Sequence, residues 1–466
     1  MELRLFNTLT GRVEALAPAA PPELRMYACG PTVYNRAHVG NFRSFVAVDL
    51  LRRTLKYKGQ RVCGVMNLTD VDDRIIQKAQ EAGRDIATFT AEYIDAFFQD
   101  METLRLERPE HVPRATGHVP EMIELIQRLQ ARGHTYTTDG SIYFRIASFP
   151  EYGRLSRLDV AGIKPGARVD TDRYEKDDAR DFVLWKAKED EPEWAHWDAP
   201  FGRGRPGWHI ECSAMSMKYL GETFDLHCGG EDLIFPHHEN EIAQATCGTG
   251  RPFVRHWMHV KHLLIDDETM SKSKGNFFTI PDLLERGHSA ETIRYLLASG
   301  HYRKPLNFTF EGLAAAAAAL ERVQGLAQRL GEVEREAAVG PAREACEAAR
   351  KQFDAALSDD LNTPEALAAV HGLVTRANAL LAEGGLGREG AGLIRAELGT
   401  MDSVFGVLFP PGEDRLSPGE QAVFDERQEA RRRREFEKAD AARARLEAMG
   451  ILLEDTPKGT RWRRKR

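Results

Sequence analysis

The chain has 466 residues, with 64 Lys+Arg against 71 Asp+Glu, six cysteines and 42% hydrophobic residues. A single core rarely grows past roughly 250–300 residues, so this length predicts several domains. The hydrophobic fraction excludes a wholly disordered chain, and no apolar stretch approaches the roughly 18 residues of a membrane span. The charged N-terminus lacks the apolar block of a signal peptide, and the cysteines are too scattered for a disulfide framework. We therefore expect a soluble, cytoplasmic protein with no membrane partner.

The overall charge of −7 is distributed unevenly. The last 40 residues, Arg427 to Arg466, carry 14 Lys+Arg and 7 Asp+Glu, whereas the other 426 residues carry 50 basic and 64 acidic side chains. A basic tail on an acidic body predicts a polyanionic partner for the tail. From charge alone, a solvated helix face explains the tail equally well.

The N-terminal third predicts a β-α-β unit. Residues 24–28 alternate as in a strand, residues 37–57 carry apolar side chains at helical spacing, and residues 61–68 read as a second strand. The helical stripe consists of Phe42, Phe45, Val46, Leu50, Leu51 and Leu55. Such a unit implies a parallel sheet with ligands bound beyond the carboxyl ends of its strands, near residues 29–41.

The later segments differ in composition. Residues 78–135 read as helical hairpins, and residues 136–205, rich in Gly, Pro, Asp and Trp, are typical of an inserted subdomain. An Ala/Leu/Glu/Arg region then predicts a helical bundle, with Leu320, Val323, Leu326 and Leu330 on one face. After a linker at 410–419 we expect one basic helix and a short strand at 450–454. The predicted α/β fold has the following parts: the first half of a Rossmann-like catalytic domain (1–135), an inserted connective subdomain (136–205), the second half of the catalytic domain (206–306), an all-α helical bundle (307–408) and a small basic C-terminal domain (409–466).

A group of soft and borderline ligands suggests a metal site. Six of the fifteen histidines lie between His227 and His262. If residues 235–244 are helical, His237 and Glu241 stand at i and i+4 on one face. Cys29 and Cys212 can add thiolates, and this donor set suits zinc. By spacing alone, a surface ion pair and two core cysteines explain these residues more simply.

Two further segments have the character of phosphate sites. Residues 31–41 follow the first strand and open the helix, where backbone N–H groups attract phosphate and where His38 and Asn41 can donate. Residues 266–276 form a polar loop whose Lys272 and Lys274 can clamp phosphates. Each has a plainer interpretation, because Gly40 can simply relieve helix–strand packing and the second segment can be a solvated loop. The Walker pattern GxxxxGK[ST] is absent from the sequence.

These two motifs, in this order and about 230 residues apart, resemble those of the class I aminoacyl-tRNA synthetases. HisValGlyAsn (38–41) is similar to the HIGH motif of that class, and ThrMetSerLysSer (269–273) to its KMSKS loop. Asn41 stands in place of the last His of the first motif, and Thr269 in place of the first Lys of the second. Without that lysine, binding of the phosphates depends on Lys272 and Lys274. Over nearly the whole chain the sequence resembles the cysteinyl-tRNA synthetases, through MetTyrAlaCysGlyProThrValTyr, AsnLeuThrAspValAspAsp, AspPheValLeuTrpLys, GlyTrpHisIleGluCysSerAlaMet, CysGlyGlyGluAspLeuIlePheProHisHisGluAsnGlu and AspAspLeuAsnThrProGluAla.

The resemblance implies a role for particular residues. It implies zinc ligands at Cys29, Cys212, His237 and Glu241. Catalysis is expected from His38, Asn41 and Lys272. ATP is expected to contact Thr32, His38, Gly40, Asn41, Met270, Ser271, Lys272 and Ser273. Trp208, His227 and Asp232 are expected to line the substrate pocket, although ordinary packing explains each of them equally well.

The resemblance also implies an activity and its partners. The expected reaction joins L-cysteine to tRNA(Cys) with ATP and Mg²⁺, and one zinc ion per chain selects the substrate by binding its thiolate. We expect a monomer. One alternative is a cysteine ligase of mycothiol synthesis, which uses the same adenylate but needs no tRNA-reading tail. The other is an inactive RNA- or zinc-binding paralogue, which the intact His38, Lys272 and ligand positions disfavour.

Overall fold

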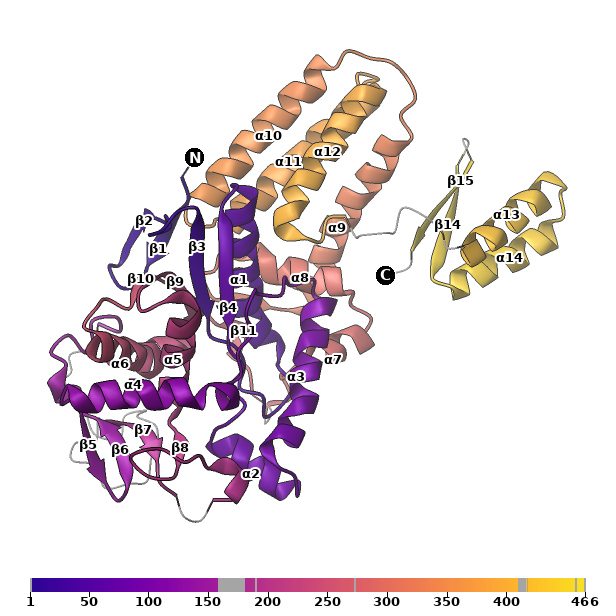
Figure 1. Cartoon of the computed structure of the whole chain (residues 1–466). Helices are drawn as coiled ribbons and strands as arrows, with labels where there is room; N and C mark the ends of the chain where they lie inside the picture. The colour runs from indigo at the N-terminus through magenta and orange to yellow at the C-terminus, as the bar shows by residue number, and fades with distance from the viewer. Residues whose placement is uncertain are drawn as a thin grey trace.

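The computed structural model describes residues 2–157, 181–188, 191–271, 274–409, 416, 418–456 and 459–464 (Figure 1). At its centre is a four-stranded sheet in which every pair of neighbours is parallel. Its order is β10-β9-β3-β4, made of β3 (Glu23–Ala28), β4 (Arg61–Met66), β9 (Phe224–Gly230) and β10 (Val254–Val260). The predicted β-α-β unit is confirmed, because α1 (Val39–Tyr57) connects β3 to its parallel neighbour β4.

Helices cover both faces of this sheet, as the alternation of strand side chains requires. Met26 and Ala28 pack into the core that α1 joins, whereas Tyr27 packs on the opposite side with Cys212 and Ala245. Cys212 belongs to α5 (Trp208–Leu220) and Ala245 to α6 (Glu239–Thr249). The arrangement is the expected Rossmann-like architecture.

An antiparallel sheet and several helices lie between the two halves of the parallel sheet in sequence. The sheet has the order β5-β6-β7-β8, made of β5 (Thr135–Thr138), β6 (Ser141–Phe144), β7 (Phe182–Lys186) and β8 (Arg205–Pro206). The helices before it are α2 (Asp73–Glu81), α3 (Ile86–Thr103) and α4 (Val119–Ala131). The sheet spans the range expected for the inserted subdomain, while the predicted domain boundaries themselves stay a prediction. An N-terminal hairpin of β1 (Arg4–Asn7) and β2 (Arg12–Ala15) packs beside β10.

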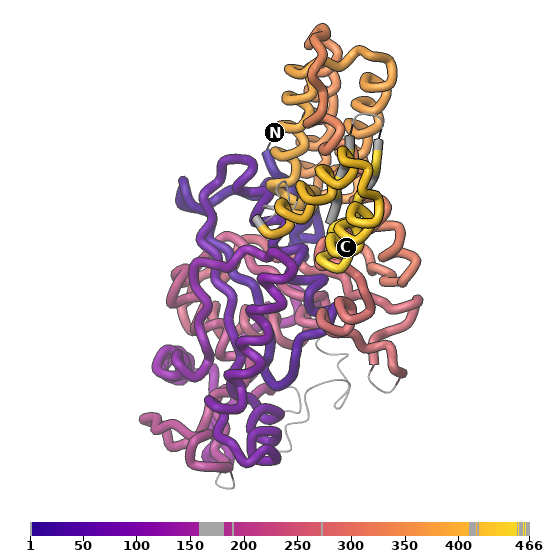
Figure 2. Tube along the Cα trace, turned by 90° about the vertical axis from the view of Figure 1, so that its right-hand side faces the viewer, coloured from indigo at the N-terminus to yellow at the C-terminus, as the bar shows by residue number. Residues whose placement is uncertain are grey.

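The chain then leads from the sheet into the bundle. The connecting elements are β11 (Leu263–Ile265), β12 (Glu268–Thr269), α7 (Ile280–Glu285), α8 (Ala290–Ser299) and β13 (Leu306–Phe308). The bundle consists of α9 (Phe310–Gly331), α10 (Gly340–Ser358), α11 (Thr363–Ala382) and α12 (Arg388–Phe405). All four residues of the predicted apolar stripe on α9 are buried. The bundle projects from the end of the molecule opposite the antiparallel sheet (Figures 1 and 2).

Buried polar side chains fix the bundle to the catalytic part. Arg294, which has no exposed surface, donates to the carbonyl oxygens of Phe405 on α12 (2.7 Å) and Leu104 after α3 (2.9 Å). Asp360, at the turn between α10 and α11, accepts a hydrogen bond from the backbone N–H of Phe6 at 2.8 Å. The AspAspLeuAsnThr segment of the sequence therefore forms a joint between the bundle and the N-terminal hairpin.

The C-terminal segment has a small core of its own. It contains α13 (Pro418–Arg432), α14 (Phe436–Ala448), β14 (Ile451–Thr456) and β15 (Gly459–Arg464). The expectation of one helix and one strand is wrong here. Arg434 has a φ of +60°, which ends the first helix inside the run of arginines, and the basic terminus pairs as a second strand. None of the helices in the described part of the chain is both long and apolar enough to cross a membrane.

Candidate active site and metal centre

Four side chains from four different segments converge beyond the end of β3. Cys29 follows β3, Cys212 lies on α5, His237 lies in the short helix Ile234–His238, and Glu241 lies on α6. Each offers one ligand atom, and these atoms all lie within 4.8 Å of one another. The structure thus brings together the four residues that the sequence grouped as metal ligands. We call them the outer set.

The contacts within the outer set are direct. Cys29 Sγ lies 3.9 Å from Cys212 Sγ and 3.9 Å from Glu241 Oε1, and His237 Nε2 lies 3.1 Å from the same oxygen. Cys29 is half-buried and the other three are buried. Two sulfurs, one imidazole nitrogen and one carboxylate oxygen at this spacing match the donors that zinc takes.

The segment that carries His237 differs in part from the helix expected over residues 235–244. Phe235 is extended (φ −137°, ψ 130°), so the regular helix begins only after it. His237 and Glu241 nevertheless stand one turn apart and meet as an i, i+4 pair. The predicted pairing of His237 with Glu241 is present because it needs a helix only over the residues after Phe235.

The electrostatics of the outer set favour a cation. Contact with Cys29 lowers the pKa of the Cys212 thiol to about 6, while burial raises the pKa of the Cys29 thiol well above its usual range. Although burial disfavours the carboxylate, His227 and His237 lower the pKa of Glu241 to about 2. Burial also disfavours a charged imidazole, yet the Cys212 thiolate and Glu241 raise the pKa of His237 to about 10. A thiolate and a carboxylate buried side by side therefore attract positive charge, which a divalent ion supplies better than one imidazolium.

Neighbouring rings hold these ligands. His209 Nδ1 lies 2.9 Å from His237 Nδ1, which leaves the other nitrogen of His237 facing Glu241. Trp208 stacks on the His237 ring with centroids 4.2 Å apart, and His227 Nε2 lies 3.0 Å from Glu241 Oε2. Partners of this kind orient metal ligands.

Two of the three expected pocket residues, Trp208 and His227, thus contact the outer set. Asp232 does not. It is exposed in the short helix Glu231–Leu233, with its carboxylate against Gly230.

The phosphate-type motifs meet at the start of α1. His38 is the N-cap of this helix: its Nδ1 accepts from the N–H of Asn41 (3.3 Å), and Asn41 Oδ1 accepts from the N–H of His38 (3.0 Å). His38 also bridges to Thr279, and its ring lies edge-on to Phe277 with centroids 5.0 Å apart. A Cβ built on Gly40 would lie 2.9 Å from Met270 Cε. The two distant motifs are therefore neighbours.

Of the other residues expected to contact ATP, only some lie in the part of the chain that the structure describes. The N–H of Ser271 donates to Asn276 Oδ1 at 2.8 Å, which shapes the loop. Lys272 and Ser273 lie outside the described residues. Thr32 bridges to the chain after β4 and lines a cavity of about 330 Å³ together with Trp208. This cavity opens beside the outer set.

Comparisons with known proteins agree along the whole chain. Residues 15–318 match the tRNA synthetases class I (C) catalytic domain, residues 352–409 the DALR domain, and residues 413–463 the cysteinyl-tRNA ligase anticodon binding domain. The chain is 49% identical to a cysteine–tRNA ligase of Solibacter usitatus and 46% identical to one of Koribacter versatilis, each alignment covering 100% of both chains. The chain belongs to the cysteine–tRNA ligase family.

Solved structures place the fold of this family member among the class I synthetases. Mycobacterium tuberculosis methionyl-tRNA synthetase in complex with methionyl-adenylate matches with a TM-score of 0.60 at 16% identity, covering 83% of this chain and 90% of that chain. The leucyl enzyme of Agrobacterium radiobacter, in a ternary complex with tRNA, matches with a TM-score of 0.60 at 12% identity, covering 84% and 85%. At these identities the likeness concerns the fold alone.

Sequence reasoning missed three histidines around the ligands of this family member. His209 supports His237, and His238 Nε2 lies 3.3 Å from Cys29 Sγ. His259, on β10, lies 2.7 Å from the other nitrogen of His238. The crowding of histidines over residues 227–262 was the available signal. It could not tell which of two adjacent histidines faces the cysteines.

Proposed function

We propose that this chain attaches L-cysteine to tRNA(Cys) at the expense of ATP. The cysteine carboxylate attacks the α-phosphorus of ATP, so that cysteinyl-adenylate forms and pyrophosphate leaves. A terminal ribose hydroxyl of the tRNA then attacks the adenylate carbonyl, and AMP leaves. The single observation that supports this best is full-length similarity to cysteine–tRNA ligases, including their anticodon binding domain. An amino-sugar ligase has no use for such a domain.

The chain's own residues contribute by holding charge. His38 and Asn41 lie at the positively polarised start of α1, where phosphates bind. Lys272 adds a cation from the facing loop and stabilises the charge that develops on the leaving pyrophosphate. ATP brings Mg²⁺ on its phosphates. Because the substrate carboxylate is already ionised, the first step needs no general base.

The outer set is proposed to hold one zinc ion through Cys29, Cys212, His237 and Glu241. Bound there, zinc supplies a soft Lewis acid for the thiolate of the substrate cysteine. Serine differs from cysteine by one atom, and a pocket that judges size alone discriminates by only about 1–3 kcal/mol. A neutral hydroxyl cannot replace a thiolate on a soft metal, so the ligand set itself supports rejection of serine. Trp208, which stacks on His237, forms the wall beside the substrate.

The other partners follow from the remaining domains. The bundle and the basic C-terminal segment are proposed to bind tRNA(Cys), with the segment at the anticodon end. We also propose that the protein acts as a monomer in the cytoplasm, where ATP, cysteine and tRNA are available.

Three measurements test this function. We expect cysteine-dependent ATP–pyrophosphate exchange, which an inactive paralogue would lack. We expect charging of tRNA(Cys), which an amino-sugar ligase would not perform. Metal analysis should find one zinc per chain, and cysteine binding should release about one proton, because a thiol with a pKa near 8.5 is mostly protonated at neutral pH. Undiminished preference for cysteine over serine after chelation would overturn the role of zinc.

A further inference from the structure

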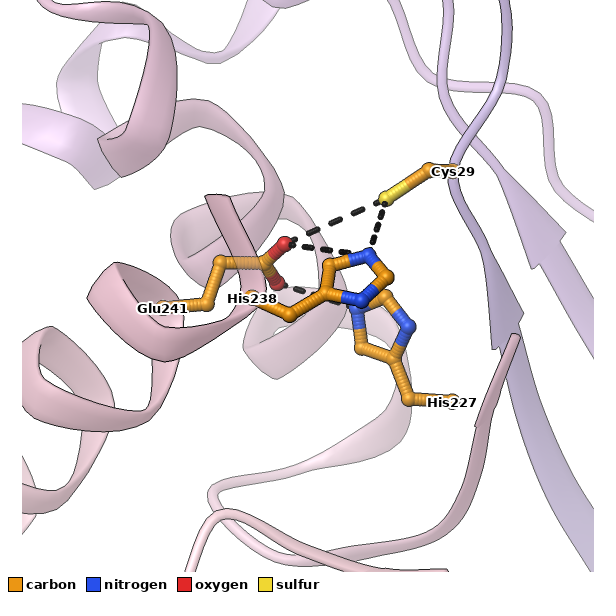
Figure 3. Close-up of side chains that lie close together, drawn as sticks. All are labelled: Cys29, His227, His238 and Glu241. Atoms are coloured by element: carbon orange, nitrogen blue, oxygen red, sulfur yellow. Dashed lines mark hydrogen bonds and ion pairs between the residues drawn. The ribbon is translucent and has the colours of Figure 1, made fainter. Parts of the chain in front are cut away.

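A second group of four donors overlaps the outer set. Cys29, His227, His238 and Glu241 also place their ligand atoms within 4.8 Å of one another (Figure 3). We call this group the inner set. It shares Cys29 and Glu241 with the outer set, so a single ion can use only one of the two sets at a time. The inner set has one thiolate and two imidazoles, whereas the outer set has two thiolates and one imidazole.

The ring of His238 is already oriented as a metal ligand. Its Nε2 faces Cys29 Sγ at 3.3 Å, and its Nδ1 lies 2.7 Å from His259 Nε2. A Cβ on Gly229 would lie 2.6 Å from His238 Cε1, so the glycine lets the ring pack against the strand. Histidine ligands are usually fixed in this way, by a partner on the nitrogen that does not bind metal.

The partner of His238 can accept a hydrogen bond from the ring nitrogen that does not bind metal. Metal binding at Nε2 needs the tautomer with a proton on Nδ1. His259 Nε2 lies at hydrogen-bond distance from this nitrogen, so it can accept from a protonated Nδ1. His259 Nδ1 lies 2.8 Å from Thr8 Oγ1, which completes the chain of hydrogen bonds.

Glu241 lies between the two sets. Its Oε1 is 3.1 Å from His237 Nε2 and 3.9 Å from His238 Nε2, while its Oε2 is 3.0 Å from His227 Nε2. Figure 3 shows the carboxylate facing both Cys29 and the inner histidines. One carboxylate can therefore serve an ion in either position without a change of backbone.

We propose that the inner set is an alternative position for the same divalent ion. His227, His238 and Glu241 have no exposed surface and Cys29 is half-buried, so an ion there has four protein donors, the number found in closed structural sites. The outer position borders Trp208 and the cavity of about 330 Å³, where a substrate thiolate can approach. The inner position is thus a resting site. This inference rests on the proposed zinc centre, because the two sets share two ligands.

Cobalt substitution of the full-length protein distinguishes the two positions. Absorption from thiolate-to-cobalt charge transfer grows with the number of thiolate ligands, which is two in the outer set and one in the inner set. The His237→Ala variant should keep one cobalt per chain, and its absorption should fall to that of one thiolate although Cys212 is still present. The nearly isosteric Cys212→Ser variant should give the same spectrum, which guards against a folding defect in His237→Ala.

Variants of shared and inner residues complete the test. Glu241→Gln should lose cobalt, and so should His237→Ala combined with His238→Ala. In the His237→Ala background, His259→Ala should weaken cobalt binding by roughly 10–100-fold, as expected for a supporting partner. The inference is overturned if His237→Ala and Cys212→Ser lose cobalt as completely as Glu241→Gln, or if His237→Ala keeps the two-thiolate absorption. Absence of metal from the unmodified protein would instead overturn the proposed zinc centre itself.

Discussion

The candidate metal centre and the candidate phosphate site are built on opposite principles. In the metal centre every expected ligand is buried or half-buried and already touches another ligand or a supporting ring. At the phosphate site, His38 is half-buried, Asn41 is exposed, and the two bond to each other as the cap of α1. The first site is assembled by folding. The second, as proposed, is completed only when ATP binds.

The difference follows from the charges involved. A buried thiolate and carboxylate are costly unless they are paired, so their partners must be part of the fold. Phosphates arrive from water already charged, so the donors at a helix start that receive them can remain exposed until the ligand binds. Substitutions in the two sites should therefore affect different quantities. At the metal centre they should lower the free energy of unfolding, and at the phosphate site they should lower the reaction rate.

The largest effect is expected at Glu241. Glu241→Ala leaves His227 and His237 without their carboxylate, and loss of one partner from a buried pair costs about 3–5 kcal/mol of unfolding free energy. Chemical denaturation and metal analysis should show both the lower stability and the loss of metal. Glu268→Ala is the matched control, because its pair with Lys274 at 2.9 Å is exposed and worth about 0–1 kcal/mol. Equal losses in the two variants would contradict a site made rigid by burial.

The next effect concerns Lys272, which should act on rate alone. Lys272→Ala should raise the barrier to adenylate formation by roughly 2–4 kcal/mol, since a cation opposite the leaving pyrophosphate is lost. Cysteine affinity and unfolding free energy should change little. Pyrophosphate exchange measures the rate. The Lys274→Ala variant is measured beside it for comparison, because Lys274 is already paired to Glu268. Near-normal exchange in Lys272→Ala would assign the clamp to another residue.

A smaller and mixed effect is expected at Asn41, which completes the capping box of α1 with the N-cap His38 and is also a candidate phosphate donor. Asn41→Ala should cost about 1 kcal/mol of stability through the lost cap and should also slow pyrophosphate exchange. Asn362→Ala removes another capping side chain, because Asn362 is the N-cap of α11 and its Oδ1 accepts from the N–H of Glu365 (3.3 Å). That control should lose stability without losing exchange. If Asn41→Ala behaves in the same way, Asn41 is only a cap.

The sequence predicted the parts of both sites that depend on local pattern. Strand alternation and helical spacing located β3, α1 and β4, and hence the turn that carries Cys29 and His38. The ligand types and the family resemblance grouped Cys29 with Cys212, although α5 is far away in the sequence.

Other features depend on contacts that no local pattern shows. His237 and His238 are adjacent, yet His237 contacts Glu241 at 3.1 Å whereas His238 faces Cys29 at 3.3 Å. Asp232 belongs to the same motif, but it lies in the short helix before the break at Phe235 and is exposed. At the C-terminus, β15 contains three arginines and a tryptophan, a composition that by itself indicates a solvated basic tail, and only its pairing with β14 makes this segment a strand. Tertiary contacts decided each of these cases.

The smallest effect on adenylate chemistry is expected from removing the C-terminal segment. Truncation before Ser417 deletes α13, α14 and the β14–β15 hairpin, which have their own core and hold none of the proposed catalytic residues. Cysteine-dependent pyrophosphate exchange should therefore survive. Binding of tRNA(Cys) should weaken, and its salt dependence should become shallower, because fewer phosphate contacts release counterions. Aminoacylation measured across a salt series decides the matter. Kinetics that match those of the full-length chain at every salt concentration would mean that the basic segment is only a solvated surface.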